Sequence, residues 1–529
     1  MMLRLQNISY THPNKDLLFD SIDLTVNKHD KIALIGNNGA GKSTLLKIIA
    51  GQCQPSAGNM TVLAQPYDVP QHFGQYNDLT VGQALQVERK LTALREIENG
   101  NATEENYALL DDDWTIEERC HQALRNWQLT DLDLQQKMGT LSGGQKTKLF
   151  LAGISIHQPE LILLDEPSNH LDYLSRQVLY DLLQSTPSTL IVVSHDRKLV
   201  NLFGKVCELS KHGIAVYGGN YEFYLQQKQA ENLALNQNIQ SKEKTLRKAR
   251  EKERQTIERQ QKLDSRGKSK QEKAGVARIM MNTLRNNAEN STAKMKTVHA
   301  EKIDGISQDL QELRAALPDI AKMKFGFDDS ALHRGKILVT ATNLNFRYGT
   351  QPLWPDSLNF QITSGERIVL KGANGSGKTT LVKLILGNLE NHIGTIYRAD
   401  SQSVYVDQDY SLIDKRLKMY EQVQKFNASA LQEHEVKNRL SRFLFTKDDW
   451  DKPCSALSGG ERMRLLLCCL TVYQQSPDLI ILDEPTNNLD IQNIEILTAA
   501  INEYRGTLLV VSHDERFLEE VHIDRTIQL

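Results

Sequence analysis

Long hydrophobic runs are missing from this chain. The strand-like apolar segments at residues 161–164, 190–193, 479–482 and 508–511 are four residues long, whereas a membrane-spanning helix needs about 20. The first ten residues, MMLRLQNISY, also lack the apolar stretch of a secretory signal. We therefore expect a protein that has no membrane segment and stays in the cytoplasm.

Cysteine is scarce and scattered. The 529 residues include six cysteines, and no two of them form a Cys-x-x-Cys pair. This spacing argues against a zinc site or a disulfide framework. It predicts that the thiols are small core residues in a reducing compartment.

Charge is nearly balanced over the whole chain but not along it. The formal net charge is −3. Residues 241–300 hold 17 Lys and Arg against 7 Asp and Glu, a net +10, so the rest of the chain carries −13. A charge run is often only the solvated face of a helix. Its meaning here depends on the segments that flank it.

Four motifs occur twice along the chain, in the same order. They are GNNGAGKS (36–43) and GANGSGKT (372–379), LSGGQ (141–145) and LSGGE (457–461), LILLDEPSNHLD (161–172) and LIILDEPTNNLD (479–490), and VVSHD (192–196 and 510–514). Repeats in register indicate two homologous domains on either side of the basic segment.

The two copies differ in one interval. Between Gln71 and Leu141 lie 69 residues, whereas 48 lie between Gln408 and Leu457. The first copy therefore has 21 more residues there, and we place the insertion near residues 94–114.

Each GxxxxGK[ST] motif lies between an apolar stretch and a helical pattern. This is the strand–loop–helix context of a phosphate loop, in which backbone N–H groups and a helix N-terminus surround the phosphates. Lys42 and Lys378 are predicted to reach the β- and γ-phosphates, with Ser43 and Thr379 on Mg²⁺. The sequence thus predicts an α/β protein that binds ATP and Mg²⁺ at two sites.

Two acids end each of the apolar patterns LILLDE and LIILDE. Asp165 and Asp483 are predicted at the carboxyl ends of buried parallel strands, where they complete the Mg²⁺ shell. Side chains alternate along a strand, so Glu166 and Glu484 are expected to point the other way, toward an attacking water. We predict that both glutamates are catalytic.

With these motifs the sequence resembles the ATP-binding-cassette (ABC) ATPases, which LSGG distinguishes from other phosphate-loop enzymes. The resemblance implies two cassettes, each a parallel-sheet core with a helical subdomain, that sandwich two ATP molecules head to tail. Lys42 and Glu166 would then work with residues 458–461, and Lys378 and Glu484 with residues 142–145.

The resemblance assigns further residues to the two sites. Gln71 and Gln408 match the glutamine that contacts the metal, and His195 and His513 match the histidine that contacts the γ-phosphate. The ATP-binding residues that it implies are Gly36, Asn37, Asn38, Gly39, Ala40, Gly41, Lys42, Ser43, Thr44, Ser142, Gly143, Gly144, Gln145, Tyr348, Gly372, Ala373, Asn374, Gly375, Ser376, Gly377, Lys378, Thr379, Thr380, Ser458, Gly459, Gly460 and Glu461.

The two predicted sites are not identical. Tyr348 matches the aromatic residue that stacks on adenine, but the corresponding residue in the first half is His12. LSGGE replaces LSGGQ, and Ser168 stands opposite Thr486. None of these changes removes a catalytic group, so we predict that both sites hydrolyse ATP.

Two cassettes in one chain without a membrane segment resemble the ABC-F branch, whose members are ribosome-associated translation and antibiotic-resistance factors. SNHLD (168–172) and YGGNYEFYLQQK (217–228) are typical of this branch. The resemblance implies a first cassette at 1–224, a helical hairpin linker at 225–325 and a second cassette at 326–529. It also implies a monomer with intramolecular cassette pairing, whose linker reaches tRNA and the peptidyl-transferase region of the ribosome.

The linker sequence predicts such a hairpin independently. Residues 227–264 contain no Gly or Pro and are rich in helix formers, so they could extend on the order of 55 Å. We expect the segment 265–275, with its two glycines, to interrupt this helix. A second helix is predicted over residues 298–317, with an apolar stripe that includes Leu310.

The basic cluster then falls near the tip of the hairpin, where cations suit RNA phosphates. The predicted RNA-contacting residues are Arg266, Lys268, Lys270, Lys273, Arg278 and Arg285. A solvated helix face and, for IMMNTLRNNAEN (279–290), simple packing are the alternatives.

Two other functions are open on the sequence alone. The chain could be the ATPase subunit of an ABC transporter, although a basic hairpin has no role there. It could also be a DNA-associated ABC ATPase, although such arms are much longer or are interrupted by zinc sites. The sequence does not separate a translation factor from a resistance protein.

Overall fold

A computed structural model describes residues 1–13, 15–211, 213–273, 297–298, 300–314, 323, 333–390, 393–473 and 476–529. The chain divides into two compact units, Met1–Tyr224 with Met323–Leu529 and Leu225–Lys322. The first unit contains both copies of the repeated motifs, which we call the first and second cassettes. The second unit is the linker.

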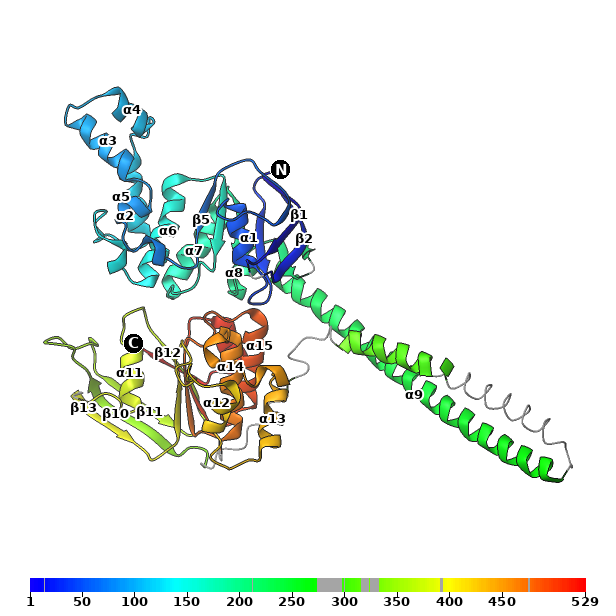
Figure 1. The fold of residues 1–529 in the computed structure, drawn as a ribbon. Coiled ribbons are helices and arrows are strands. Elements are labelled where there is room, and N and C mark those ends of the chain that lie inside the picture. Colours follow the sequence, from blue (N-terminus) through cyan, green and yellow to red (C-terminus); the bar gives the residue numbers. More distant parts are fainter. Residues whose placement is uncertain are drawn as a thin grey trace. The chain divides into compact units, whose positions relative to one another are not determined.

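The first cassette is built on two sheets (Figure 1). A six-stranded sheet has the order β5-β6-β7-β3-β8-β9, in which only β8 and β9 pair antiparallel. An antiparallel sheet has the order β2-β1-β4. The strands are β1 (Leu3–Thr11), β2 (Leu17–Val26), β3 (Lys31–Ile35), β4 (Ala57–Val62), β5 (Pro66–Val69), β6 (Leu161–Asp165), β7 (Thr189–Val193), β8 (Val206–Ser210) and β9 (Gly213–Tyr217).

Helices of the first cassette follow its phosphate loop, form a helical region after β5, and follow β6 and β7. They are α1 (Lys42–Ile49), α2 (Val81–Ala84), α3 (Glu88–Glu98), α4 (Glu104–Leu110), α5 (Ile116–Asn126), α6 (Gly143–His157), α7 (Tyr173–Ser185) and α8 (Arg197–Asn201), with 3-10 turns η1 (Gly74–Tyr76) and η2 (Met138–Thr140).

The second cassette repeats this plan. A parallel sheet has the order β14-β15-β16-β12-β17, and an antiparallel sheet has the order β11-β10-β13. The strands are β10 (Ile337–Asn345), β11 (Leu358–Thr363), β12 (Arg367–Lys371), β13 (Ile393–Arg398), β14 (Ser403–Val406), β15 (Leu479–Asp483), β16 (Thr507–Val511) and β17 (Arg525–Gln528). The helices are α11 (Lys378–Ile385), α12 (Met419–Lys425), α13 (Glu433–Arg442), α14 (Gly459–Val472), α15 (Ile491–Glu503) and α16 (Glu515–Glu520), with η4 (Lys447–Asp449) and η5 (Cys454–Ala456).

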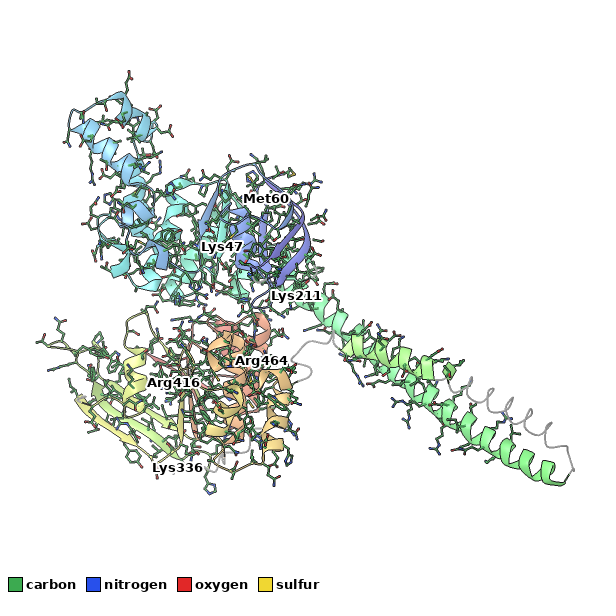
Figure 2. The ribbon with its side chains drawn as sticks, in the orientation of Figure 1. Lys47, Met60, Lys211, Lys336, Arg416 and Arg464 are labelled. Atoms are coloured by element: carbon green, nitrogen blue, oxygen red, sulfur yellow. The ribbon has the colours of Figure 1, made fainter. Side chains whose placement is uncertain are left out.

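The short apolar runs of the sequence are the central strands of these sheets. Every residue of β6, β7 and β16 is buried, as are four of the five in β15. A parallel strand with both faces covered needs continuous apolar sequence rather than alternation. In each cassette a buried cluster joins the antiparallel sheet, the central sheet and the helix after the phosphate loop. Figure 2 adds the described side chains, with Lys47 of α1 and Arg464 of α14 labelled. The predicted α/β fold is confirmed.

The predicted insertion is a helical pair. α3 and α4 occupy residues 88–110 and stand out from the rest of the first cassette's helical region in Figure 1. Between α12 and α13 the second cassette has only a short connection. Arg119 of α5 anchors the segment, because its guanidinium donates to both oxygens of Asp113 at 2.8 and 2.9 Å.

The linker is a helical hairpin, but its first helix is longer than the sequence predicts. α9 runs from Tyr221 to Lys273 and passes through Gly267 without a break. A single glycine costs a helix only about 1 kcal/mol relative to alanine, and strong helix formers flank it on both sides. The interruption that we expected within residues 265–275 is therefore wrong as far as Lys273, and Gly275 lies outside the described residues.

A second helical segment covers the described residues 300–314. Leu310 on it is 5% exposed and Ile239 on α9 is 7% exposed. The ion pairs Lys242–Asp309 and Glu243–Arg314 hold the two helices side by side. The predicted apolar stripe thus forms the seam between them.

The predicted tip cations are only partly described. Arg266 lies on α9 with its side chain exposed. Lys268, Lys270 and Lys273 lie on the same helix, outside the residues whose side chains are described. Arg278 and Arg285 lie outside the described residues altogether. Nowhere in the described part of the chain is a helix both long and apolar enough to span a membrane.

Candidate functional site

Each phosphate loop turns sharply into the helix that follows it. Gly41 precedes α1 with φ +97°, and Gly377 precedes α11 with φ +94°. A Cβ at Gly41 would lie 2.7 Å from Phe19, and one at Gly377 would lie 2.7 Å from Leu353. Only glycine satisfies both the left-handed backbone and the close approach. This explains the spacing of glycine in the motif.

The loop lysines reach back over the loops. Lys42 Nζ donates to Gly36 O at 2.7 Å and Asn37 O at 3.2 Å. Lys378 Nζ donates to Gly372 O at 2.8 Å in the second loop. Burial lowers the pKa of both amines, and acids around each site act against this shift. Each loop therefore carries one cation among its own carbonyl groups.

In each site the hydroxyl and the aspartate predicted to bind the metal come together. Ser43 hydrogen-bonds to Asp165, and Thr379 hydrogen-bonds to Asp483, while burial raises the pKa of both acids. Asp165 Oδ1 is buried and has no hydrogen-bond partner. One carboxylate beside one hydroxyl, with a free buried oxygen, fits Mg²⁺, which binds few protein ligands and takes the rest from phosphate and water. Among the described residues no group of three or more His, Cys, Asp and Glu could hold a metal alone.

The two predicted bases do not continue the strands. β6 ends at Asp165 and β15 at Asp483. Glu166 and Glu484 have φ +52° and +50°, so the strand alternation that we used to orient them does not apply. Their N–H groups donate to Val193 O and Val511 O of the neighbouring strands. A left-handed residue that is not glycine is costly, and such strain gathers at functional sites.

Each glutamate faces the predicted histidine of its own cassette. Glu166 Oε1 lies 3.4 Å from His195 Nε2, and Glu484 Oε1 lies 3.5 Å from His513 Nε2. Burial raises the pKa of Glu166 to about 8 and that of Glu484 to about 7. Burial and the loop lysine lower the pKa of His513 to about 4. A carboxyl group whose pKa lies near neutral pH, beside an uncharged imidazole, suits proton transfer.

A cavity at the first site gathers most of its predicted residues. It is lined by His12, Leu18, Asn38, Gly39, Gly41, Lys42, Ser43, Thr44, Gln71, Asp165, Glu166, Val193, His195 and Asn488. Gln71 thus joins the metal ligands, and His12 occupies the place that corresponds to Tyr348. In the second site Tyr348 is 69% exposed, and its hydroxyl lies 3.0 Å from Thr380 Oγ1. Gln408 follows β14, and no described contact ties it to Asp483.

The NHLD and NNLD segments connect the cassettes, a role that sequence reasoning missed. The N–H of Asn38 donates to Asp490 Oδ2 at 2.7 Å, and Asn38 Nδ2 donates to Asn488 O at 3.0 Å. In the second site Asn374 Nδ2 donates to His170 O at 3.1 Å. The repetition of these polar segments, which differ only at His170 and Asn488, was the available signal.

The LSGG serines begin helices. Ser142 caps α6 and Ser458 caps α14, each in a capping box with the residue three positions later. Gln145 and Glu461 thus bind back to their own helix N-termini, and Glu461 also pairs with Lys452 at 3.1 Å. The difference between LSGGQ and LSGGE leaves the cap unchanged.

The predicted pairing of LSGG with the opposite loop is visible on one side. Gly144 lies close to Asn374 of the second loop, since a Cβ there would be 3.7 Å from Asn374 Nδ2. On the other side Asn488, rather than residues 458–461, lines the cavity of the first site.

Tyr405 is a second residue that the sequence did not single out. Its hydroxyl donates to Asp483 Oδ2 at 2.8 Å. The corresponding residue of the first cassette is Asp68, which accepts from Gln52 Nε2 at 2.9 Å. The sequence repeat shows that tyrosine stands in the second cassette where aspartate stands in the first. It does not predict the contact with Asp483, because β5 and β14 had no predicted role in the sites.

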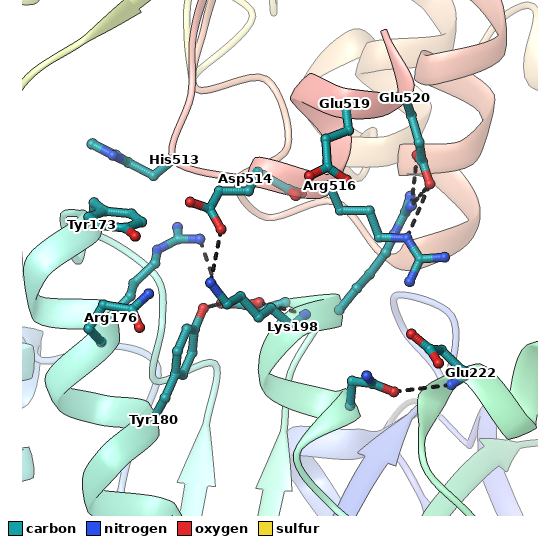
Figure 3. Close-up of a pocket in the computed structure, with 15 residues that line it drawn as sticks. Tyr173, Arg176, Tyr180, Lys198, Glu222, His513, Asp514, Arg516, Glu519 and Glu520 are labelled. Atoms are coloured by element: carbon teal, nitrogen blue, oxygen red, sulfur yellow. Dashed lines mark hydrogen bonds and ion pairs between the residues drawn. The ribbon is translucent and has the colours of Figure 1, made fainter. Parts of the chain in front are cut away.

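Helices α8 and α16 carry opposite charges across the cassettes. Arg197 Nη1 lies 2.7 and 2.8 Å from the two oxygens of Glu520, and Lys198 Nζ lies 2.9 Å from Glu515. Figure 3 shows this charged surface around Lys198, Arg516 and Glu520. In the second copy of the repeat, Glu515 and Arg516 stand at the positions of Arg197 and Lys198. The ion pairs therefore join helices whose charged residues differ between the two cassettes.

Comparisons with known proteins agree with this geometry. A family model described as ABC transporter matches residues 19–169 and 355–487. The putative ATP-binding protein YdiF of Bacillus subtilis (strain 168) is 32% identical over 98% of this chain and 79% of its own length. ABC transporter F family member 2 of Arabidopsis thaliana is 29% identical over 100% of this chain and 76% of its own length.

Among solved structures, the archaeal ribosome recycling factor aABCE1, in complex with the archaeal ribosomal stalk protein aP1, has the same fold. Its TM-score is 0.60 at 20% identity, over 99% of this chain and 87% of that chain. Fold, repeated motifs and relatives lead to one conclusion. The chain belongs to the ATP-binding-cassette family, in its ABC-F branch, and its cassettes bind and hydrolyse ATP.

Proposed function

We propose that ATP-driven closure of the two cassettes controls binding of this protein to the ribosome, and that the hairpin linker contacts RNA there. The observation that carries the proposal is the joining of two ATPase cassettes by a helical hairpin that contains a segment, residues 241–300, of net charge +10. An ATPase pair supplies a two-state element that the γ-phosphate biases. A long cationic arm supplies a surface for phosphates.

In the nucleotide cycle, Lys42 and Lys378 bind the β- and γ-phosphates. Ser43 and Asp165, and Thr379 and Asp483, hold Mg²⁺, with Gln71 and Gln408 beside them. The metal supplies charge neutralisation at the phosphates. Glu166 and Glu484 accept the proton of the attacking water, and His195 and His513 contact the γ-phosphate. The SGGQ and SGGE segments complete the opposite sites.

The RNA contacts belong to the basic cluster of the arm. Its proposed members are Arg266, Lys268, Lys270, Lys273, Arg278 and Arg285. Arg247 and Arg250 of α9 are exposed and line a groove of the hairpin together with Arg314. These arginines extend the cationic surface from the cluster along the arm.

The relatives and the fold neighbour support this setting. The chain is similar to F family members of the ABC proteins, and its fold is that of a ribosome recycling factor. We propose a cytoplasmic monomer that acts as a translation factor or protects the ribosome from an antibiotic.

Co-sedimentation with ribosomes tests the proposal. Glu166→Gln/Glu484→Gln protein binds ATP without hydrolysing it, so it is expected to sediment with ribosomes in ATP and to remain free in ADP. Binding should weaken steeply across a salt series. Absence of ATP-dependent sedimentation at low salt would refute the ribosomal role, and association with membranes instead would favour a transporter subunit.

A further inference from the structure

The second cassette has a tyrosine beside its predicted metal ligand, where the first cassette has an aspartate. Tyr405 lies on β14 and pairs with Ile481 of β15. Asp68 lies on β5 and pairs with Leu163 of β6. Ile481 and Leu163 each precede the aspartate that ends their strand by two residues. Tyr405 and Asp68 therefore occupy the same place in the two central sheets.

The strand register brings Tyr405 to the face of the sheet on which Asp483 lies. Paired residues of neighbouring strands point to the same face, and so do residues two apart on one strand. Ile481 and Asp483 are two apart, so the side chain of Tyr405 extends along the face that carries Asp483. Its hydroxyl donates to Asp483 Oδ2 at 2.8 Å, and its ring packs against the buried core cluster of the cassette. The core thus holds the ring, and the ring holds a donor against one carboxylate oxygen.

Asp483 also accepts a hydrogen bond from the end of its own phosphate-loop motif. The donor is the hydroxyl of Thr379, at the start of α11. Two hydroxyls from different elements, Tyr405 on β14 and Thr379 on α11, therefore orient one carboxylate. Hydrogen bonds to a carboxylate are charge-assisted and are stronger than bonds between neutral groups. A carboxylate that is oriented in advance needs less rearrangement when a cation binds.

In the described part of the first cassette, the corresponding strand offers Asp165 no such donor. Asp68 stands at the place of Tyr405, and its carboxylate accepts from Gln52 Nε2 at 2.9 Å. An ionised carboxylate can only accept, so it cannot hold a second carboxylate as a phenol does. Asp165 Oδ1 is buried and has no hydrogen-bond partner. The two metal-binding aspartates therefore have different neighbours.

The first cassette has a tyrosine one residue earlier on the same strand, but it points the other way. Tyr67 pairs with Ile162, which precedes Asp165 by three residues rather than two. A shift of one residue moves a side chain to the opposite face of a sheet. The hydroxyl of Tyr67 accordingly donates to Phe150 O of α6 at 2.8 Å. This tyrosine does not replace Tyr405.

We propose that Tyr405 is a positioning residue of the second ATP site, which holds the Asp483 carboxylate in the orientation in which it meets a divalent cation. The inference rests on the proposed role of Asp483 as a ligand of Mg²⁺. Loss of a group that hydrogen-bonds to a metal ligand typically weakens metal binding or activity 10- to 100-fold. Removal of the Tyr405 hydroxyl should therefore weaken the effect of Mg²⁺ at the second site and leave the first site as it is.

Binding of a fluorescent, non-hydrolysable ATP analogue with and without Mg²⁺ tests the inference. In full-length Lys42→Ala protein the first site lacks its phosphate-binding cation, so binding reports the second site, and Lys378→Ala protein reports the first. The quantity measured is the ratio of the Kd in EDTA to the Kd in Mg²⁺. In Lys42→Ala protein, Tyr405→Phe should lower this ratio about 10- to 100-fold and leave the Kd in EDTA unchanged. In Lys378→Ala protein, the same substitution should leave the ratio unchanged.

Tyr67→Phe is the matched control. It removes a hydroxyl from the equivalent strand of the first cassette, on the face away from Asp165, and should leave the Mg²⁺ dependence of both sites unchanged. Tyr405→Phe keeps the ring and its packing, so its melting temperature should stay close to that of the unmodified protein. If thermal unfolding shows that this variant is not folded, Tyr405→Leu, which also lacks the hydroxyl, replaces it.

The outcomes are distinct. An unchanged ratio at the second site, an equal loss at both sites, or a loss of affinity in EDTA as large as that in Mg²⁺ would overturn the role of Tyr405. If Asp483→Asn left the ratio of the second site unchanged, the role of Asp483 as a metal ligand would fail instead, whatever Tyr405 does. Because these measurements contain no ribosomes, they are independent of the proposed ribosomal role.

Discussion

The backbone N–H of Asn38 donates to Asp490 Oδ2 at 2.7 Å, although 452 residues separate them. Asp490 is 3% exposed, and its other oxygen caps α15 by accepting from Asn493 N at 2.8 Å. One carboxylate therefore ends a helix of the second cassette and holds the phosphate loop of the first.

Asp490→Asn should separate these two roles. An asparagine oxygen can still cap α15, but its amide group cannot accept from Asn38 N at the same time. We expect slower ATP hydrolysis with a melting temperature close to that of the unmodified protein. Asp490→Ala should also lose about 1 kcal/mol of stability with the cap. Equal melting temperatures of the two variants would contradict this division.

Replacing the glutamates should reveal two working sites. Glu166→Gln and Glu484→Gln should each retain part of the steady-state phosphate release, whereas the double variant should lose about 10²- to 10⁴-fold, the range for a general base. The physical reason is that glutamine keeps the shape but cannot accept the proton. A single variant with full activity would show that its site does not contribute.

The ion pair of Arg197 and Glu520 should respond unequally to loss of either partner. Arg197 has a side chain only 3% exposed, whereas Glu520 is 33% exposed. Glu520→Gln leaves a buried cation without its partner, a change that costs about 3 kcal/mol in comparable pairs. Arg197→Met leaves a carboxylate that water can reach, so its cost should be smaller. Denaturant unfolding of both single variants and the double variant measures the difference, and a larger cost for Arg197→Met would contradict it.

Neutralising the arm should change ribosome binding and its salt dependence together. Each lost phosphate contact should reduce the slope of log K against log salt by about 0.7 to 0.9. ATP hydrolysis by the free protein should be kept. In the arm variant, glutamine replaces each of four basic residues: Arg266, Lys268, Lys270 and Lys273. A charge-matched control replaces four exposed lysines of the cassettes, Lys15, Lys28, Lys336 and Lys447. An equal effect of both variants would indicate a general charge effect instead of arm contacts.

Asp113 should stabilise the inserted helices at neutral pH. Burial alone would raise the pKa of Asp113, but hydrogen bonds from Arg119 and Lys90 lower it below 3.8. A lowered pKa gives stability that is present above the unfolded value and lost as the pH falls through the folded value. Asp113→Asn should therefore speed proteolysis within residues 94–114 at pH 7, and this excess over the unmodified protein should begin to fall near pH 4 and vanish only below the lowered pKa of Asp113. An unchanged cleavage rate at pH 7 would argue against the anchor.

Repetition made most of the fold predictable. Local motifs such as GNNGAGKS and LILLDE need a strand, a tight loop and a helix, because glycine conformations and continuous apolar sequence permit little else. The 21-residue difference between the copies located α3 and α4. The end of the first linker helix was not predictable, because flanking helix formers outweighed Gly267.

The sequence by itself determined the two ATP cassettes, the insertion and the basic linker, since each rests on local pattern and repeated spacing. Only the tertiary structure revealed the backbone turn at Glu166 and Glu484, the contact of Asn38 with Asp490 and the ion pair of Arg197 with Glu520. These depend on which loops meet across the cassettes. Local sequence does not specify these contacts, because hydrogen bonds and ion pairs between distant segments form only when both segments are packed.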